Sequence, residues 1–530
     1  MSVLLTRLVG CAVLACVFPL PGWSQDRSVL QQAVQQIEKQ NLEGAEALLR
    51  DYVRRQNGDG LAYYLLGVAL GGQGKREESS KYLHKALQLD KNLTPALRFL
   101  GLNAFEAGDF DEAREYLQSY LEKAPGDEVA HVSFAQVLLA RNELSLAVRH
   151  FRQAKTLVQE DAGLQLLFGR ALLSSDQTEE AENVLVSIES RDLEVLFETG
   201  VLLARASNYE GAIEKFKLAR SGYPDPLALE FNLALSYFKS GDTAAAIGIL
   251  NETIQHGRAD ADVYSLLGDA YLREKRYPEA RNALQKALAL APTEVRHHVD
   301  LLTLYVELDE IDPGLAFANA ALDKHPDNYE LCALRAELHL RRHQTHLAEA
   351  DYRRALQISR TTNWLYTGLA TLLAFEDDRL EEAKTLLESR LEKFTDYYSF
   401  YLYSEVLRQM GLDRSAPYQQ RVQRLLEKSV RLNPNFPPAR LNLGRIYAGL
   451  QDWPNAISQF ETAVAADPGD KRPYYELYKI YVRMGVREKA QEMLAFVREI
   501  NKNESGKTMR ENVRERVEAL KRARRSGQQY

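Results

Sequence analysis

Apolar residues recur along most of the chain in pairs of stripes with helical spacing. In the stretch that begins at Ala261, the apolar and small positions run Tyr264, Leu267, Gly268, Tyr271, then Ala280, Leu284, Ala287, and finally Pro292. Residues three, four and seven apart share one face of a helix. The stretch therefore predicts two amphipathic helices joined by a turn, within a unit of 34 residues.

The same unit recurs at fixed spacing. From Pro437 the matching positions are Arg440, Leu443, Gly444, Tyr447, Ala456, Phe460, Ala463 and Pro468, and from Thr94 they are Leu97, Leu100, Gly101, Ala104, Ala113, Leu117, Tyr120 and Pro125. Fourteen units begin at residues 26, 60, 94, 128, 162, 193, 227, 261, 295, 329, 361, 397, 437 and 471. Nine of the spacings between these starts are 34 residues. A long array of equal units predicts a repeat architecture rather than a few globular domains.

Small residues and helix breakers have a physical role in this unit. Small side chains at positions 8 and 20 let the two helix backbones approach closely. Glycine at position 15, as in Gly74, Gly108 and Gly241, favours the left-handed conformation that ends a first helix. Proline at position 32 ends the second helix, because its ring cannot continue an interior turn.

These positions resemble those of the tetratricopeptide repeat family, W-x2-L-G-x2-Y, A-x3-F and P, from residue 26 to about residue 500. The resemblance implies an all-α fold. It implies a right-handed α-solenoid, or superhelix, of about fourteen helix-turn-helix repeats with a C-terminal capping helix. It also implies that the first helices line a concave groove, with positions 2, 5, 9, 12 and 13 facing the ligand.

The units group into segments of different regularity. We assign residues 26–192 to repeats one to five, 193–360 to repeats six to ten, 361–436 to irregular repeats eleven and twelve, and 437–504 to repeats thirteen and fourteen. Residues Asp413 to Pro417 account for the extra length of the forty-residue unit. This insertion is interpreted either as a tolerated surface loop or as a bend that shapes a binding pocket.

Both ends differ from the repeat. Residues 1–25 have the pattern of an export signal, with Arg7, an apolar run from Leu8 to Phe18 and small residues before Gln25. A lipoprotein signal with attachment at Cys16 is the less favoured alternative. Residues 505–530 predict a basic capping helix or tail, with an apolar stripe at Met509, Val513, Val517 and Leu520. The alternative for this tail is contact with an anionic membrane or nucleic acid.

Composition narrows the range of functions. The net charge of −7 does not indicate a nucleic-acid partner. We found no phosphate-binding loop, dinucleotide fingerprint or nucleophile elbow, so we predict no enzyme activity, no cofactor and no metal. His339, His343 and His346 have a spacing that can hold zinc, but ordinary packing is the favoured interpretation. The same holds for Cys332 as a buried thiol and for Glu376, Asp377 and Asp378 as a solvated loop rather than a calcium site.

The groove positions predict two ligand-facing zones near the C-terminal end. Tyr398 and Tyr401 form an aromatic zone beside Leu365 and Leu369. Arg445, Arg472, Lys479 and Arg483 form a basic zone. Some members of the family clamp a terminal carboxylate, but that pattern is not met, because Leu102 follows Arg98 where asparagine is required.

The leading hypothesis is an exported scaffold, periplasmic or extracellular, that binds a protein or an extended peptide in the groove. The alternative is an assembly or secretion factor that binds an exported polysaccharide, for which the aromatic zone is suited. Membrane contact is expected only if Cys16 carries a lipid. An enzyme is the third and least favoured class.

Overall fold

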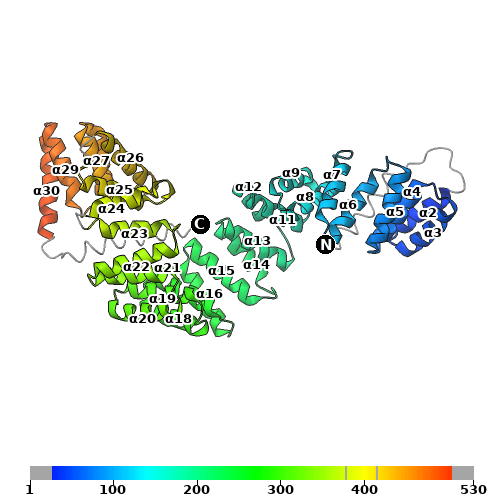
Figure 1. Cartoon of the computed structure of the whole chain (residues 1–530), viewed down its shortest axis with the longest axis horizontal. Coiled ribbons are helices and arrows are strands. Elements are labelled where there is room, and N and C mark those ends of the chain that lie inside the picture. Colours follow the sequence, from blue (N-terminus) through cyan, green and yellow to red (C-terminus); the bar gives the residue numbers. More distant parts are fainter. Residues whose placement is uncertain (1–26, 376–378, 413–415, 504–530) are drawn as a thin grey trace. The chain divides into compact units, whose positions relative to one another are not determined.

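The computed structural model describes residues 27–375, 379–412 and 416–503. These residues form the α-helices α2 to α30 and one short 3-10 helix, η2 at Leu391–Lys393, and they contain no strand (Figure 1). The helices follow one another as fourteen pairs in chain order. The predicted all-α repeat fold is confirmed.

The chain divides into two compact units, and the first of them ends at Arg276. The first helices of its pairs are α2 (Arg27–Glu38), α4 (Gly60–Gly72), α6 (Pro95–Ala107), α8 (Glu128–Ala140), α11 (Ala162–Leu173), α13 (Leu193–Arg205), α15 (Pro226–Ser240) and α17 (Ala261–Arg273). The second helices are α3 (Leu42–Arg55), α5 (Arg76–Leu89), α7 (Phe110–Leu121), α9 (Leu144–Gln153) with α10 (Lys155–Glu160), α12 (Thr178–Val186), α14 (Tyr209–Ala219) and α16 (Thr243–Gln255).

The second unit begins at Tyr277. It opens with the second helix α18 (Tyr277–Leu290). Its first helices are α19 (Val295–Glu307), α21 (Tyr329–Arg341), α23 (Asn363–Leu373), α25 (Tyr397–Gln409), α27 (Pro437–Gly449) and α29 (Lys471–Arg483). Its second helices are α20 (Ile311–Lys324), α22 (Thr345–Ile358), α24 (Leu380–Glu388), α26 (Ala416–Leu432), α28 (Trp453–Ala466) and α30 (Arg487–Asn503).

Glycine at position 8 lets the two helices of a pair lie close together, as predicted. A Cβ atom added at Gly101 would lie 2.6 Å from Cγ of Leu117 in the second helix of the same repeat. A Cβ atom at Gly444 would lie 2.6 Å from the ring of Phe460. The apolar residue at position 24 therefore packs directly on the backbone of the first helix.

The turn between the two helices has a left-handed residue at position 15 in thirteen of the fourteen pairs. Five of these residues are glycine and eight are not: Gly74, Gly108, Gly241, Gly411, Gly485, and Gln40, Asn142, Asp176, Ser207, Lys275, Asp309, His343, Gln451. The remaining pair has Phe375 at this position. The turn geometry is therefore more regular than the residue type, and the eight side-chain-bearing residues adopt a conformation that costs energy.

We expect Gln451→Gly to raise the free energy of unfolding by about 0.5–1 kcal/mol, because glycine adopts the left-handed conformation without steric cost. Gln451 has φ +60° and lies between α27 and α28. Urea unfolding followed by circular dichroism measures the change. In the control, Gln118→Gly inside α7, stability should fall by about 1 kcal/mol. Equal destabilisation by both substitutions would contradict the argument.

Several predicted features lie outside the described residues. These are the export signal at residues 1–25, the capping helix or tail at 505–530, the acidic residues 376–378, and residues 413–415 of the insertion. Among the helices that are described, none is both long and apolar enough to cross a membrane.

Candidate functional site

The six residues predicted to face a ligand lie on three first helices of the second unit, near the end of the described chain (Figure 1, yellow to orange). Tyr398 and Tyr401 lie on α25, and Arg445 lies on α27. Arg472, Lys479 and Arg483 lie on α29. Since α27 contacts α29, the basic residues form neighbouring parts of one surface.

The two tyrosines differ in exposure. Tyr398 is 4% exposed and belongs to the hydrophobic core of the second unit. Tyr401 is half-buried, and its ring centroid lies 6.1 Å from that of Tyr398 and 5.1 Å from that of Phe436. Tyr401 can therefore border a ligand, whereas Tyr398 supports it from within the core.

Two carboxylates lie among the four cations. Nε of Arg445 donates to Oε1 of Glu476 at 3.0 Å, and Lys479 pairs with the other oxygen of the same carboxylate. Arg472 pairs with Asp470 at 2.8 Å. Arg483 is exposed. Four cations therefore face two carboxylates, and the surface keeps an excess of positive charge.

Position 5 is buried in most repeats, although the resemblance had implied a ligand-facing role. Leu365 is 0% and Leu441 is 3% exposed, because first helices of successive repeats pack against one another. The equivalent residue on α29, Tyr475, is 49% exposed, and Val482 at position 12 is 52% exposed. Since α30 is the last described helix, no further described repeat covers these two side chains.

We call Arg445, Arg472, Tyr475, Lys479, Val482 and Arg483 the C-terminal surface. The ring of Tyr475 stacks with that of Tyr478 at 6.0 Å, and Nζ of Lys479 lies 5.2 Å from the Tyr475 ring centroid. The surface therefore combines an apolar and aromatic centre with a cationic border. Sequence reasoning missed Tyr475 and Val482, although their places at positions 5 and 12 of the last unit could have revealed them.

Of the other candidates, Cys332 lies in the core, whereas His343 and His346 are exposed. Cys332 is 0% exposed, and burial raises the pKa of its thiol, which disfavours the reactive thiolate. Nδ1 of His339 lies 2.9 Å from Oε1 of Gln344. His343 is the left-handed turn residue of its repeat. The described residues contain no group of three side chains placed to hold a metal ion.

Arg98, which stands at a position of the carboxylate clamp, is buried. It is 5% exposed, and its Nη1 lies 3.2 Å from Oδ2 of Asp127. Tyr120 donates its hydroxyl proton to the same carboxylate at 2.7 Å, and burial together with this bond raises the pKa of Tyr120 to about 12. Arg98 therefore contacts the residue that caps the first helix of the next repeat, α8, instead of facing a ligand.

The paired helices, the close glycine contacts and the recurring left-handed turn define a helical-repeat solenoid. A family model described as "Tetratricopeptide repeat" matches residues 64–128, 166–225, 231–295 and 421–471. A second model with the same description matches residues 104–155. The chain belongs to the tetratricopeptide repeat family.

Curated relatives match parts of the chain at low identity. DnaJ homolog subfamily C member 3 of Gallus gallus is 23% identical over 277 residues, which are 52% of this chain and 50% of the relative. Protein O-mannosyl-transferase TMTC1 of Homo sapiens is 26% identical over 193 residues, which are 36% of this chain and 21% of the relative. The chain thus spans half the length of the first relative and less of the second.

A solved structure, the hetero-tetramer of APC/C subunits Cut9 and Hcn1, contains a chain that aligns with 14% sequence identity and a TM-score of 0.40. The alignment covers 86% of this chain and 96% of the solved chain.

Proposed function

We propose that this tetratricopeptide-repeat scaffold for protein–protein interaction is not an enzyme and binds an acidic, apolar segment of a partner protein at the C-terminal surface. One observation carries the proposal. Tyr475, whose equivalents at position 5 are buried in most other repeats, is 49% exposed, and together with the 52% exposed Val482 it is bordered by Arg445, Arg472 and Lys479.

The chemistry of the surface favours such a partner. Removing half-exposed apolar side chains from water stabilises a complex, and tyrosine contributes a rigid ring at a small entropy cost. The excess of positive charge steers acidic segments toward the surface and disfavours basic ones. Carboxylates of the partner would compete for Arg445 and Lys479, which share Glu476.

A polysaccharide partner was the alternative expected from the aromatic zone. Tyr398 is buried, so it offers almost no face to a sugar ring. Tyr401 is half-buried, and its ring packs against those of Tyr398 and Phe436. These observations favour a protein partner over a polysaccharide. Glycan binding is one of the results that the binding experiment below distinguishes.

We expect the double variant Tyr475→Ala, Val482→Ser to bind a labelled peptide with a central phenylalanine between glutamates about tenfold more weakly than the original chain, since about 1.4 kcal/mol of apolar contact is lost. Fluorescence anisotropy measures the affinity. The matched control is Leu218→Ser, Leu290→Ser, at side chains that are 54% and 57% exposed elsewhere.

The control should bind the peptide unchanged, and a peptide with lysines in place of glutamates should not bind. Equal affinity of the double variant and the original chain would refute the proposal. Binding of a neutral glycan array, lost in the same double variant, would favour the polysaccharide alternative instead.

We also propose that the chain acts outside the cytoplasm. The support is the pattern of residues 1–25 alone. N-terminal sequencing of the mature protein should give a start near Gln25, and a mature protein that begins at Met1 would remove the proposal.

A further inference from the structure

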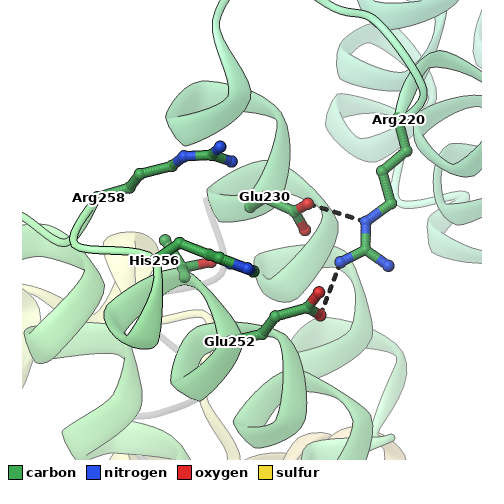
Figure 2. Close-up of a pocket in the computed structure, with 6 residues that line it drawn as sticks. Arg220, Glu230, Glu252, His256 and Arg258 are labelled. Atoms are coloured by element: carbon green, nitrogen blue, oxygen red, sulfur yellow. Dashed lines mark hydrogen bonds and ion pairs between the residues drawn. The ribbon is translucent and has the colours of Figure 1, made fainter.

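A small hollow lies in the first unit, among α14, α15, α16 and the segment that follows α16 (Figure 2). Its volume is about 150 Å³, and it is lined by Arg220, Glu230, Glu252, Thr253, His256 and Arg258. Four of the six side chains carry a formal charge. Ordinary small-molecule pockets measure roughly 300–1,000 Å³, so the hollow has room for a group the size of one side chain.

Glu230 occupies a position where most repeats hold a large side chain. It is at position 4 of its unit, which is Tyr264 in the next repeat and Trp364 further along. The Glu230 side chain is 12% exposed. The Glu230 side chain therefore places a charge at the edge of the helix stack and occupies less volume there than an aromatic ring.

Arg220 pairs with both carboxylates of the hollow. Its Nε donates to Oε1 of Glu230 and its Nη2 donates to Oε2 of Glu252, both at 2.8 Å, as the dashed lines in Figure 2 show. The first of these bonds contributes most to raising the pKa of Arg220, and the second lowers the pKa of Glu252. The other oxygen of Glu230 is enclosed, so an incoming group cannot reach it.

Hydrogen-bond donors remain available on the opposite side. Figure 2 shows Arg258 and His256 across the hollow from Arg220. Both residues are exposed, and no hydrogen bond or ion pair to another described residue engages either side chain. Arg220 uses two of its five N–H groups in the bonds to Glu230 and Glu252. Arg258 and the remaining N–H groups of Arg220 are thus donors that an incoming group can use.

We infer that the hollow is a binding site for one carboxylate group of a partner protein. Arg220 is paired with both Glu230 and Glu252, so Arg258 is the cation of the hollow that an incoming carboxylate would meet. A guanidinium group holds a carboxylate through two parallel hydrogen bonds, which Arg258 can offer. The site lies in the first compact unit and is independent of the C-terminal surface in the second.

The test uses the full chain and three capped tripeptides observed by saturation-transfer NMR. The peptides are acetyl-Ala-Glu-Ala-amide, acetyl-Ala-Gln-Ala-amide, and acetyl-Ala-Gln-Ala with a free terminal carboxylate. We expect the glutamate peptide to bind at least tenfold more tightly than the glutamine amide. In Arg258→Ala this preference should fall at least fivefold, whereas Arg205→Ala, at an exposed arginine outside the hollow, should retain it.

The third peptide distinguishes the source of the carboxylate. Binding of the free-terminus peptide that is lost in Arg258→Ala would support the carboxylate site and assign it to chain ends instead of side chains. Equal binding of all three peptides would overturn the inference, as would an undiminished preference in Arg258→Ala. Circular dichroism of both variants verifies that they are folded.

Discussion

Asp351→Ala is expected to lower the free energy of unfolding of the second unit by about 3–5 kcal/mol, because it leaves a largely buried cation without its partner. Oδ2 and Oδ1 of Asp351 accept bonds from Nε and Nη2 of Arg335 at 2.8 and 2.5 Å. Asp351 is 5% exposed, and the Arg335 side chain is 19% exposed. Nη1 of Arg335 donates to Asn319 at 2.8 Å, which alone cannot balance the charge.

The effect should be local, since each repeat contacts mainly its neighbours. Hydrogen exchange is expected to accelerate in α21 and α22, which hold Arg335 and Asp351, and to stay unchanged in α2 to α8. The double variant Arg335→Met, Asp351→Leu removes both charges and should lie within about 1.5 kcal/mol of the original chain. If Asp351→Ala alone were equally mild, the pair would not be the stabilising contact that its geometry indicates.

Acidification from pH 7 to pH 4 is expected to remove about 2–3 kcal/mol of stability through the histidine pair of the fourth repeat. Nε2 of His131 lies 3.0 Å from the carbonyl oxygen of Pro125 and can donate to it. The Nδ1 atoms of His131 and His150 lie 2.8 Å apart, so one proton between them forms a hydrogen bond and a second would oppose it. Burial, the charge of His131 and that of Arg149 lower the pKa of His150 to about 4.

The lowered pKa of His150 determines how its contribution to stability changes with pH. The folded pKa of His150 lies below its ordinary value of 6.5, so the unfolded chain binds more protons between these two values. The contribution is therefore complete above pH 6.5 and is lost as the pH falls toward 4. Other groups also titrate in this range, so the measurement compares urea unfolding of the original chain with that of His131→Phe, His150→Leu at pH 7, 5.5 and 4.5.

The difference between the two proteins should shrink by about 2–3 kcal/mol across the series. A difference that stays constant with pH would show that the histidine pair does not carry this acid sensitivity.

The arrangement of each repeat was predictable from short-range patterns. Gly101 at position 8 and Gly74 at position 15 have the close contact and the left-handed turn that their positions indicate. These features depend on residues within one unit, and helix periodicity determines which side chains meet. The number of repeats follows from the same periodicity.

The ligand-facing residues were less predictable, because their exposure depends on the packing between repeats. Tyr398 and Tyr401 stand three residues apart on α25, yet one is buried and the other half-buried. Tyr475 is exposed because it lies in the last described pair of helices. The sequence pattern within a single repeat does not show this place in the array. The hollow at Arg220 combines residues from two repeats, and only the fold shows that Arg258 faces it.

The left-handed turns have a consequence for how this chain can change over evolutionary time. Eight of them hold a residue other than glycine, and each such position is a place where one substitution can add stability without altering a packed helix face. Substitutions that compensate for a loss of stability are thus available at many turns along the array. A costly change at Tyr475 or Arg258 that alters partner choice could be offset at a distant turn, which leaves the binding surfaces free to diversify.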